Sequence, residues 1–229
     1  MSDAVYLAIE TSTPLGSVAV GNGAGVLAEV VLGIHARHSE ALLPAVDFGL
    51  RNAQVDKREL QRIVVGGGPG SFTGLRISAA TAKALAQALG IPLFAYSGLA
   101  ALAAGAGASR DPVCGLFDAR RGEVYAACYR FPDFDTMETL LEPAPRKIDD
   151  VLGALDPQAT VFVGDGALQN RAAIERAGGC VAPAHLAVPR ASALLWLTDF
   201  LPTAGSVENV ASWEPLYLRE SGAERMRAR

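Results

Sequence analysis

VYLAIETSTPLGSVAV, residues 5–20, is an apolar strand that ends in a carboxylate, followed by a polar loop, a glycine and a second strand. VCGLFDARRGEVYA, residues 113–126, has the same plan. A shorter repeat pairs IVVGGG, residues 63–68, with VFVGDG, residues 161–166, and both continue into a helical pattern. Any two β-hairpins share some of these features, so coincidence is the alternative. Because internal repeats can decide a fold, we expect two lobes of common design that face a cleft.

Strands and helices alternate outward from these repeats. Short β-rich runs at 5–9, 16–20 and 26–32 predict a three-stranded meander. Further strands are expected near 63–65, 93–96, 113–117, 124–129 and 161–163, and helices near 39–53, 72–89, 99–104, 168–177 and 191–201. Asp56 to Glu59 resembles a capping box for a single turn. The alternation favours a layered α/β architecture.

Composition restricts the class of protein. Of 229 residues, 50% are apolar and 19% are charged, which is close to an ordinary globular protein. The net charge of −4 offers no basic surface for direct, tight nucleic-acid binding, so we expect any role on RNA to run through a partner. No segment reaches the roughly 20 apolar residues of a membrane span, and the first residues lack the pattern of a signal peptide.

Three cysteines, Cys114, Cys128 and Cys180, are an odd number without CxxC spacing. They signal neither a disulfide framework nor a zinc ribbon. A reducing, cytoplasmic location is therefore expected.

The glycine-rich run from Gly66 to Ser71 precedes the long helix, and consecutive N–H groups in such a place can hold an anion. A P-loop would need a lysine before Gly74, whereas Lys83 lies deep in the helix, and the spacing of a dinucleotide-binding loop also fails. The alternative is that these glycines allow tight turns and close helix packing.

A carboxylate and three hydroxyls, Glu10 to Thr13, follow the first strand, and this chemistry could meet a phosphate or a metal-bound water. The alternative is a turn that satisfies its own backbone. The candidate nucleotide or phosphate residues are Glu10, Thr11, Ser12, Gly68, Gly70, Ser71 and Asp118.

Metal and hydrolase chemistry is not indicated. His35 and His38 are three residues apart, but His185 is distant and no Asp or Cys cluster accompanies them, so we expect no metal site. Gly70 to Gly74 does not match the GxSxG elbow of a serine hydrolase.

The helix over 72–89 is apolar or small on nearly every side. A helix of this kind must be buried on all sides. One face can pack on the chain's own sheet, and the other needs the helix over 39–53 or another chain. Placement in the core is the alternative, and we prefer an interface.

The order and spacing of five segments resemble the TsaB family, also called YeaZ, over most of the chain. The segments are Leu7 to Ser12, His38 to Glu40 with Leu43 and Pro44, Gly68 to Arg76, Asp118 to Tyr125, and Pro215 to Arg219. The resemblance implies a two-lobed α/β fold of the actin-like and sugar-kinase-like (ASKHA) type, duplicated, with mixed sheets flanked by helices. It implies an N-terminal lobe at 1–105, a C-terminal lobe at 106–190, a helix and tail at 191–219 that pack back across the lobes, and disorder at 220–229.

For function, the resemblance implies a subunit required for threonylcarbamoyladenosine, the modified adenosine beside the anticodon of tRNAs that read codons starting with A. The implied partners are TsaD, a metal-dependent transferase, and TsaE, an ATPase, with tRNA met only through the complex. TsaD carries two metal-binding histidines four apart after the corresponding helix, and residues 91–102 here contain no histidine. This absence predicts a non-catalytic scaffold without a cofactor, although weak nucleotide binding stays open.

The resemblance also assigns the two apolar helices to a bundle with TsaD or with a second copy of the chain. The predicted interface residues are His38, Ser39, Leu42, Leu43, Val46, Leu75, Arg76, Ala79 and Lys83. Arg76 is a candidate for a charge-assisted contact at the rim, and an exposed, solvated arginine is the alternative.

Two other functions are compared with the scaffold. A stand-alone ATP-dependent phosphotransferase or hydrolase would use Glu10, Asp118 and the Gly68 to Ser71 loop, but the chain is short for that work. Glycoprotease, an old label of the wider family, has little support without zinc ligands.

Overall fold

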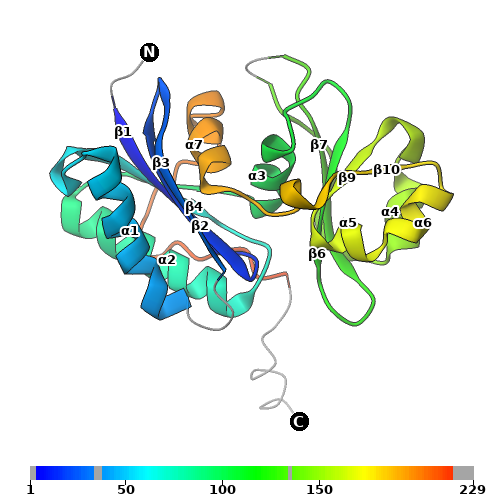
Figure 1. Cartoon of the computed structure of the whole chain (residues 1–229), viewed down its shortest axis with the longest axis horizontal. Helices are drawn as coiled ribbons and strands as arrows, with labels where there is room; N and C mark the ends of the chain where they lie inside the picture. Colours follow the sequence, from blue (N-terminus) through cyan, green and yellow to red (C-terminus); the bar gives the residue numbers. More distant parts are fainter. Residues whose placement is uncertain (1–3, 34–37, 134–135, 219–229) are drawn as a thin grey trace, which may run out of the picture.

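The computed structural model describes residues 4–33, 38–133 and 136–218, without the side chains of His38 and Ser39. Its elements form five layers, with two sheets that enclose a central pair of helices and further helices on each outer side (Figure 1).

The first sheet has the strand order β3-β2-β1-β4-β5. Its strands are β1 Val5–Glu10, β2 Leu15–Asn22, β3 Gly25–Gly33, β4 Leu60–Gly66 and β5 Leu93–Tyr96. The β1 to β3 strands are antiparallel, as the predicted meander requires, and β4 and β5 add in parallel. This sheet is therefore mixed.

The second sheet has the order β8-β7-β6-β9-β10, which repeats the first strand by strand. Its strands are β6 Val113–Asp118, β7 Val124–Arg130, β8 Glu138–Arg146, β9 Val161–Val163 and β10 Cys180–Val181. Again the first three are antiparallel and the last two parallel. The duplication predicted from the two sequence repeats is confirmed, and with it the two-lobed α/β plan of mixed sheets flanked by helices.

The helices also correspond. The described elements include α1 His38–Ala53, α2 Phe72–Leu89, α3 Gly98–Gly105, α4 Ile148–Ala154, α5 Asp165–Gln169, α6 Arg171–Arg176 and α7 Ala191–Phe200, with single turns at Lys57–Glu59, Pro157–Ala159 and Ala184–Leu186. Asp56 caps the turn before β4, and Asp156 caps the turn before β9, which is the equivalent strand of the second lobe. The capping box predicted at Asp56 is confirmed.

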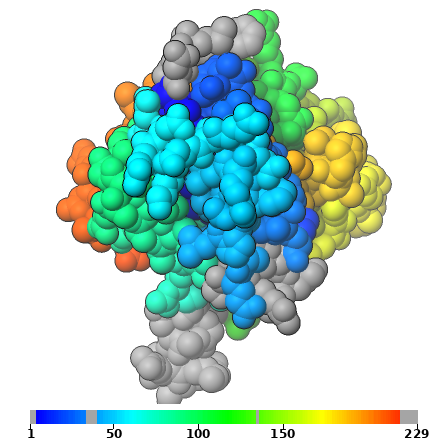
Figure 2. Space-filling model, turned by 60° about the vertical axis from the view of Figure 1, so that its left-hand side comes forward, coloured from blue at the N-terminus to red at the C-terminus, as the bar shows by residue number. Residues whose placement is uncertain are grey.

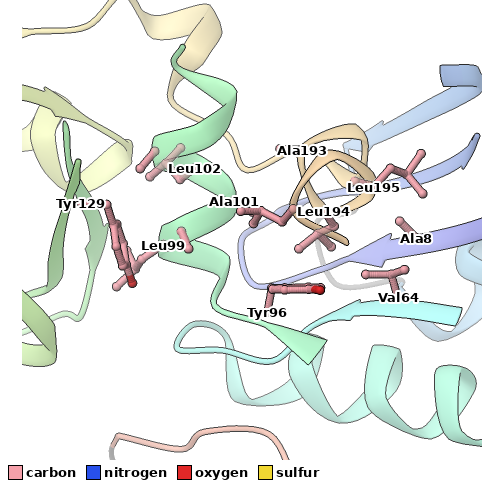
Figure 3. Packing of buried hydrophobic residues seen from close by; sticks show 14 of the residues in the cluster. Ala8, Val64, Tyr96, Leu99, Ala101, Leu102, Tyr129, Ala193, Leu194 and Leu195 are labelled. Carbon is pink, nitrogen blue, oxygen red and sulfur yellow. The ribbon is translucent and has the colours of Figure 1, made fainter. Parts of the chain in front are cut away.

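The central helices are exchanged between the lobes. After β5 of the first sheet, α3 packs on β6 and β7 of the second, and after β10 of the second sheet, α7 packs on the strands of the first. The two helices also contact each other, and Figure 3 shows Leu99 and Leu102 of α3 near Tyr129 and Leu194 of α7 near Ala8. One hydrophobic core therefore joins the two lobes.

Each sheet has a second core on its outer face. In the first lobe, α1 and α2 cover Leu7, Ile9, Val18 and Val65. In the second, residues of α4, α5 and α6 cover the outer face of β6 and β7.

Two expectations need correction. The helix predicted near 168–177 is two short helices, because the Asn170 side chain donates to the Gly166 carbonyl (2.8 Å) and interrupts the repeat between α5 and α6. The strands β8 and β10 and the helix α4 were not predicted, and neither were the single turns at Pro157–Ala159 and Ala184–Leu186. Pro143 and Pro145 make residues 138–146 unlike a strand in sequence. The edge strand β8 tolerates them because its outer N–H groups need no partner.

After α7 the chain returns along the first sheet. Ala95 N–H donates to Gly205 O (2.8 Å), and Val207 N–H donates to Leu93 O (3.0 Å). The tail expected at 220–229 lies outside the described residues. Among the described helices, none has both the length and the apolar character needed to cross a membrane.

Candidate functional site

Two loops that follow β1 and β4 meet beneath the N-terminus of α2. Ser71 N–H donates to Ser12 O (2.7 Å), and Thr11 Oγ1 donates to Gly74 O (2.9 Å). Ser71 in turn caps α2, since its Oγ accepts from Gly74 N–H (3.3 Å). The structure therefore brings the predicted residues Thr11, Ser12, Gly70 and Ser71 together.

The contact between these loops is very close. A Cβ atom at Gly70 would lie 2.4 Å from Ser12 O, and one at Gly74 would lie 2.0 Å from Thr11 O. Gly70 also has φ +158°, and Gly68 has φ +96° in the left-handed region that favours glycine. Close packing accounts for these glycines, because the hydroxyl loop occupies the space beside the glycine-rich run.

Glu10 is fully buried at the end of β1. Its Oε1 accepts from Ser12 N–H (2.6 Å), while Oε2 has no hydrogen-bond partner among the described residues. Burial raises the pKa of Glu10, and the hydrogen bonds from Ser12 and Thr11 act in the opposite direction. A carboxyl group enclosed in this way is poorly suited to clamp a metal–phosphate pair, which needs an accessible carboxylate.

Gly66 and Gly98 form the walls around that carboxyl group. A Cβ atom at Gly66 would lie 2.0 Å from Glu10 Oε2, and one at Gly98 would lie 2.9 Å from Ser12 Oγ. Gly98 begins α3, so the acid sits where β1, β4 and a central helix converge. The acid is therefore enclosed by the joint between the lobes.

Asp118 occupies the equivalent position in the second lobe, yet it is exposed. Its Oδ1 accepts from Arg120 N–H (2.7 Å), and its own N–H donates to Asp165 Oδ1 (3.1 Å). Burial raises the pKa of Asp165, against the hydrogen bonds that it accepts from Asp118 and Gly166. The hydrogen bonds described for Asp118 stay within the second lobe and do not join it to the Glu10 loops.

The end of the described chain covers the glycine-rich run. Leu216 N–H donates to Gly67 O (2.8 Å), and the Tyr217 ring lies 5.0 Å from the Phe72 ring. Lys83 holds the same segment, since its Nζ donates to Ala211 O (2.8 Å) and Trp213 O (2.9 Å). Lys83 therefore anchors the chain itself, and its predicted place in a partner interface stays a prediction.

Four other predicted interface residues, Leu42, Val46, Leu75 and Ala79, are buried within the chain. They lie on the sides of α1 and α2 that pack inward, so they support this helical layer and do not form its surface. Both helices carry apolar side chains on their inner and outer sides, so the sequence pattern did not distinguish the buried side of each helix from its exposed side.

The outer face of the helical layer is formed by other residues. Leu43 is 57% exposed and Phe48 is 54% exposed, both on α1, and Ala80 and Ala84 are exposed on α2. Figure 2 shows α1 at the front of this side of the molecule, with α2 beside it. We call these four residues the outer helical patch.

Three predicted interface residues remain, namely Arg76, His38 and Ser39. Arg76 is exposed, with its guanidinium 5.4 Å from the centre of the Phe72 ring. His38 and Ser39 begin α1, and their side chains lie outside the described residues.

Phe48 was missed by sequence reasoning. It falls outside the inward stripe of Leu42, Val46 and Leu50, and a large aromatic off that stripe was the available signal.

Within the described residues, no group of three His, Cys, Asp or Glu side chains is arranged to hold a metal ion. His35 lies outside that part of the chain, and His185 is in the single turn at Ala184–Leu186.

Comparison with protein families places residues 24–225 in a match to the family described as TsaD, tRNA N6-adenosine threonylcarbamoyltransferase. The tRNA threonylcarbamoyladenosine biosynthesis protein TsaB of Bacillus subtilis is 39% identical over 125 residues, 55% of each chain. The chain thus spans about half the length of that relative. The TsaB of Escherichia coli is 31% identical over 224 residues, 95% of each chain.

Solved structures agree with these relatives. YeaZ from Pseudomonas aeruginosa superposes with a TM-score of 0.75 at 28% identity, over 94% of this chain and all of that one. A second Pseudomonas aeruginosa protein, described as similar to peptidase YEAZ, gives a TM-score of 0.79 at 31% identity over the same shares.

Proposed function

The chain belongs to the TsaB (YeaZ) family, and from that premise we propose that it is a non-catalytic subunit in the biosynthesis of threonylcarbamoyladenosine on tRNA. In this proposal it acts in the cytoplasm as scaffold and activator of a TsaD-like transferase, together with a TsaE-like ATPase. It meets the tRNAs that read codons starting with A only through the complex.

The observation that carries the proposal is the outer helical patch. Leu43 and Phe48 expose large apolar side chains on α1, and the exposed Ala80 and Ala84 on α2, which packs beside α1, permit another helix to approach closely. Aromatic and aliphatic side chains of this size often anchor protein interfaces. Helices of the transferase, or those of a second copy, would pack against this patch.

The closure of the loops around Glu10 supports the non-catalytic part of the proposal. Ser12 packs against Gly70, Thr11 is bonded to Gly74, and Leu216 lies over Gly67. A phosphotransferase would need room for a nucleotide between such loops. The chain therefore supplies a surface, and the transferase supplies the chemistry.

The first test is threonylcarbamoyl transfer to tRNA by a purified TsaD-like transferase and TsaE-like ATPase, with and without this protein. We expect modified tRNA only in the full mixture. Transfer by this chain alone would overturn the non-catalytic role, and full activity without the chain would overturn the scaffold role.

The second test places the contact. Leu43→Arg and Phe48→Arg should abolish co-elution with the transferase and leave the circular dichroism spectrum unchanged. Leu140→Arg is the matched control, because Leu140 is 39% exposed on β8 of the other lobe. Sedimentation of the same variants without the transferase tests whether the patch also forms a homodimer.

The competing function is a stand-alone phosphotransferase or hydrolase. It predicts an ATPase activity of the isolated chain that Glu10→Ala and Asp118→Ala remove. We expect no activity above background in the unchanged protein.

A further inference from the structure

Cys114 of β6 and Cys128 of β7 are directly opposite each other in the second sheet. Both side chains are fully buried on the outer face of that sheet, in the core covered by α4 and α6. Their sequence spacing alone did not indicate a pair, because the strand register that brings them together is visible only in the fold.

The register also fixes the type of pairing. Ala119 N–H donates to Glu123 O (3.0 Å) at the end of this hairpin, and the β6–β7 pairs then run in strict succession to Cys114 and Cys128. Hydrogen-bonded and non-hydrogen-bonded pairs alternate along an antiparallel ladder, so the two cysteines occupy a non-hydrogen-bonded pair. In such pairs the Cα atoms are about 4.5 Å apart, which falls within the range that a disulfide spans.

The two thiols differ in acidity. Burial raises the pKa of Cys114, and its hydrogen bond to Cys128 adds to that effect, while the charge of Arg146 opposes it. The same hydrogen bond lowers the pKa of Cys128, against its burial. The Cys114 thiol is therefore the donor, and the Cys128 sulfur is the better nucleophile.

The backbone over Cys128 is irregular. The pairing of β7 with β8 shifts register on both sides of Cys128, and β8 is an edge strand that contains Pro143 and Pro145. Pairing is weakest at such bulges, so small local openings there cost little. A small oxidant would reach the buried pair from this side.

We propose that Cys114 and Cys128 are an oxidisable pair that closes to a reversible disulfide across β6 and β7. With a peroxide as oxidant, the Cys128 thiolate attacks one oxygen, the O–O bond breaks, and the released hydroxide takes a proton to become water. The Cys114 sulfur then attacks the resulting sulfenic acid, the S–S bond forms, the S–O bond breaks, and a second water leaves. Two thiols lose two electrons to one peroxide, and a dithiol reductant reverses the step.

Cys180 is the internal contrast. It is exposed on β10 and pairs in register with Val161, not with a cysteine. It can form only adducts or links between chains.

The test exposes the full-length Cys180→Ser variant to hydrogen peroxide, then counts thiols with Ellman's reagent after unfolding. We expect two thiols before treatment and none afterwards, and both again after dithiothreitol. A tryptic peptide map should show the strands of 114 and 128 joined in the monomer.

Single variants separate the two sulfurs. In Cys114→Ser, the Cys128 sulfenic acid should persist and be labelled by dimedone, whereas Cys128→Ser should leave Cys114 unlabelled. Two thiols that survive peroxide in the Cys180→Ser protein would overturn the proposal, as would oxidation found only at Cys180 in the unchanged chain. Circular dichroism of each variant checks that the fold is intact.

Discussion

The two lobes share one plan of strands, yet they treat the carboxylate after their first strand in opposite ways. Glu10 is fully buried beneath a closed pair of loops, whereas Asp118 is exposed at the end of β6. The helices differ as well, because α2 runs unbroken from Phe72 to Leu89, and its counterpart is divided at Asn170 into α5 and α6. Duplication has kept the sheets, and the outer layer of the first lobe has become a long helical face.

The difference teaches which parts of a duplicated fold are constrained. Each sheet must present an apolar face to the same central core, so strand order and direction are preserved. Loops and outer helices meet no such requirement, so one lobe can close its loop while the other leaves its loop exposed.

The largest effect should come from adding one methyl group between the closed loops. Gly74→Ala would put a Cβ atom 2.0 Å from the backbone oxygen of Thr11. Neither helix nor loop can yield that much, so we expect a loss of more than about 3 kcal/mol in the free energy of unfolding, by urea titration. In the other lobe, Gly166→Ala meets the Leu116 backbone at 3.0 Å and should cost about 1 kcal/mol. Equal losses for Gly74→Ala and Gly166→Ala would show that the loops of the first lobe are packed no more closely than those of the second.

Equivalent outer helices offer the next comparison. Leu42 of α1 and Val151 of α4 are both buried against their own sheets. Leu42→Ala should cost about 3 kcal/mol in unfolding free energy, because it removes more buried side chain than a valine can lose. Val151→Ala should cost less, near 2 kcal/mol. A smaller loss for Leu42→Ala would mean that α1 is loosely packed on its sheet.

The buried acid should make the first lobe sensitive to pH. Since the folded pKa of Glu10 is raised, the folded state keeps a proton that the unfolded chain loses above about pH 4.5. This contribution to stability is complete below that pH and is lost as pH rises through the folded pKa.

Glu10→Gln removes this titration. The unfolding free energy of the variant, measured by thermal melting and compared with that of the unchanged protein, should therefore rise with pH, by up to about 1.4 kcal/mol per pH unit. Asp118→Asn is the control at the equivalent exposed position and keeps an oxygen for Arg120 N–H. A pH-independent difference for Glu10→Gln would contradict a raised pKa at Glu10.

The smallest effect should be the same in both lobes. Asp56→Ala removes the acceptor for Arg58 N–H, and Asp156→Ala removes the acceptor for Gln158 N–H. Each should lower the unfolding free energy by about 1 kcal/mol, measured by thermal melting. Clearly different losses for Asp56→Ala and Asp156→Ala would show that the two capped turns have diverged, as the loops after β1 and β6 have.

Much of the fold was predictable because the repeats lie in the strands themselves. Residues 5–20 and 113–126 predicted corresponding hairpins, and IVVGGG and VFVGDG predicted the parallel strands beside them. Elements without a pattern, such as the proline-containing β8 and the two-residue β10, were not predictable in this way.

The site was less predictable, since burial depends on neighbours distant in sequence. A helix with apolar residues on all sides does not reveal that Leu42 faces inward and Leu43 outward. The hydrogen bonds of Lys83 to Ala211 and Trp213 join residues that are 128 and 130 positions apart in sequence. The opposition of Cys114 and Cys128 likewise required the register.

The exchange of α3 and α7 has a consequence for how the chain matures on the ribosome. The inner face of the first sheet is covered by α7, whose last residue is Phe200. Synthesis proceeds from the N-terminus, so all five strands of that sheet emerge long before their cover exists. The inner face of the first sheet therefore stays uncovered until α7 has been synthesised, so the first lobe can complete its core only together with the second.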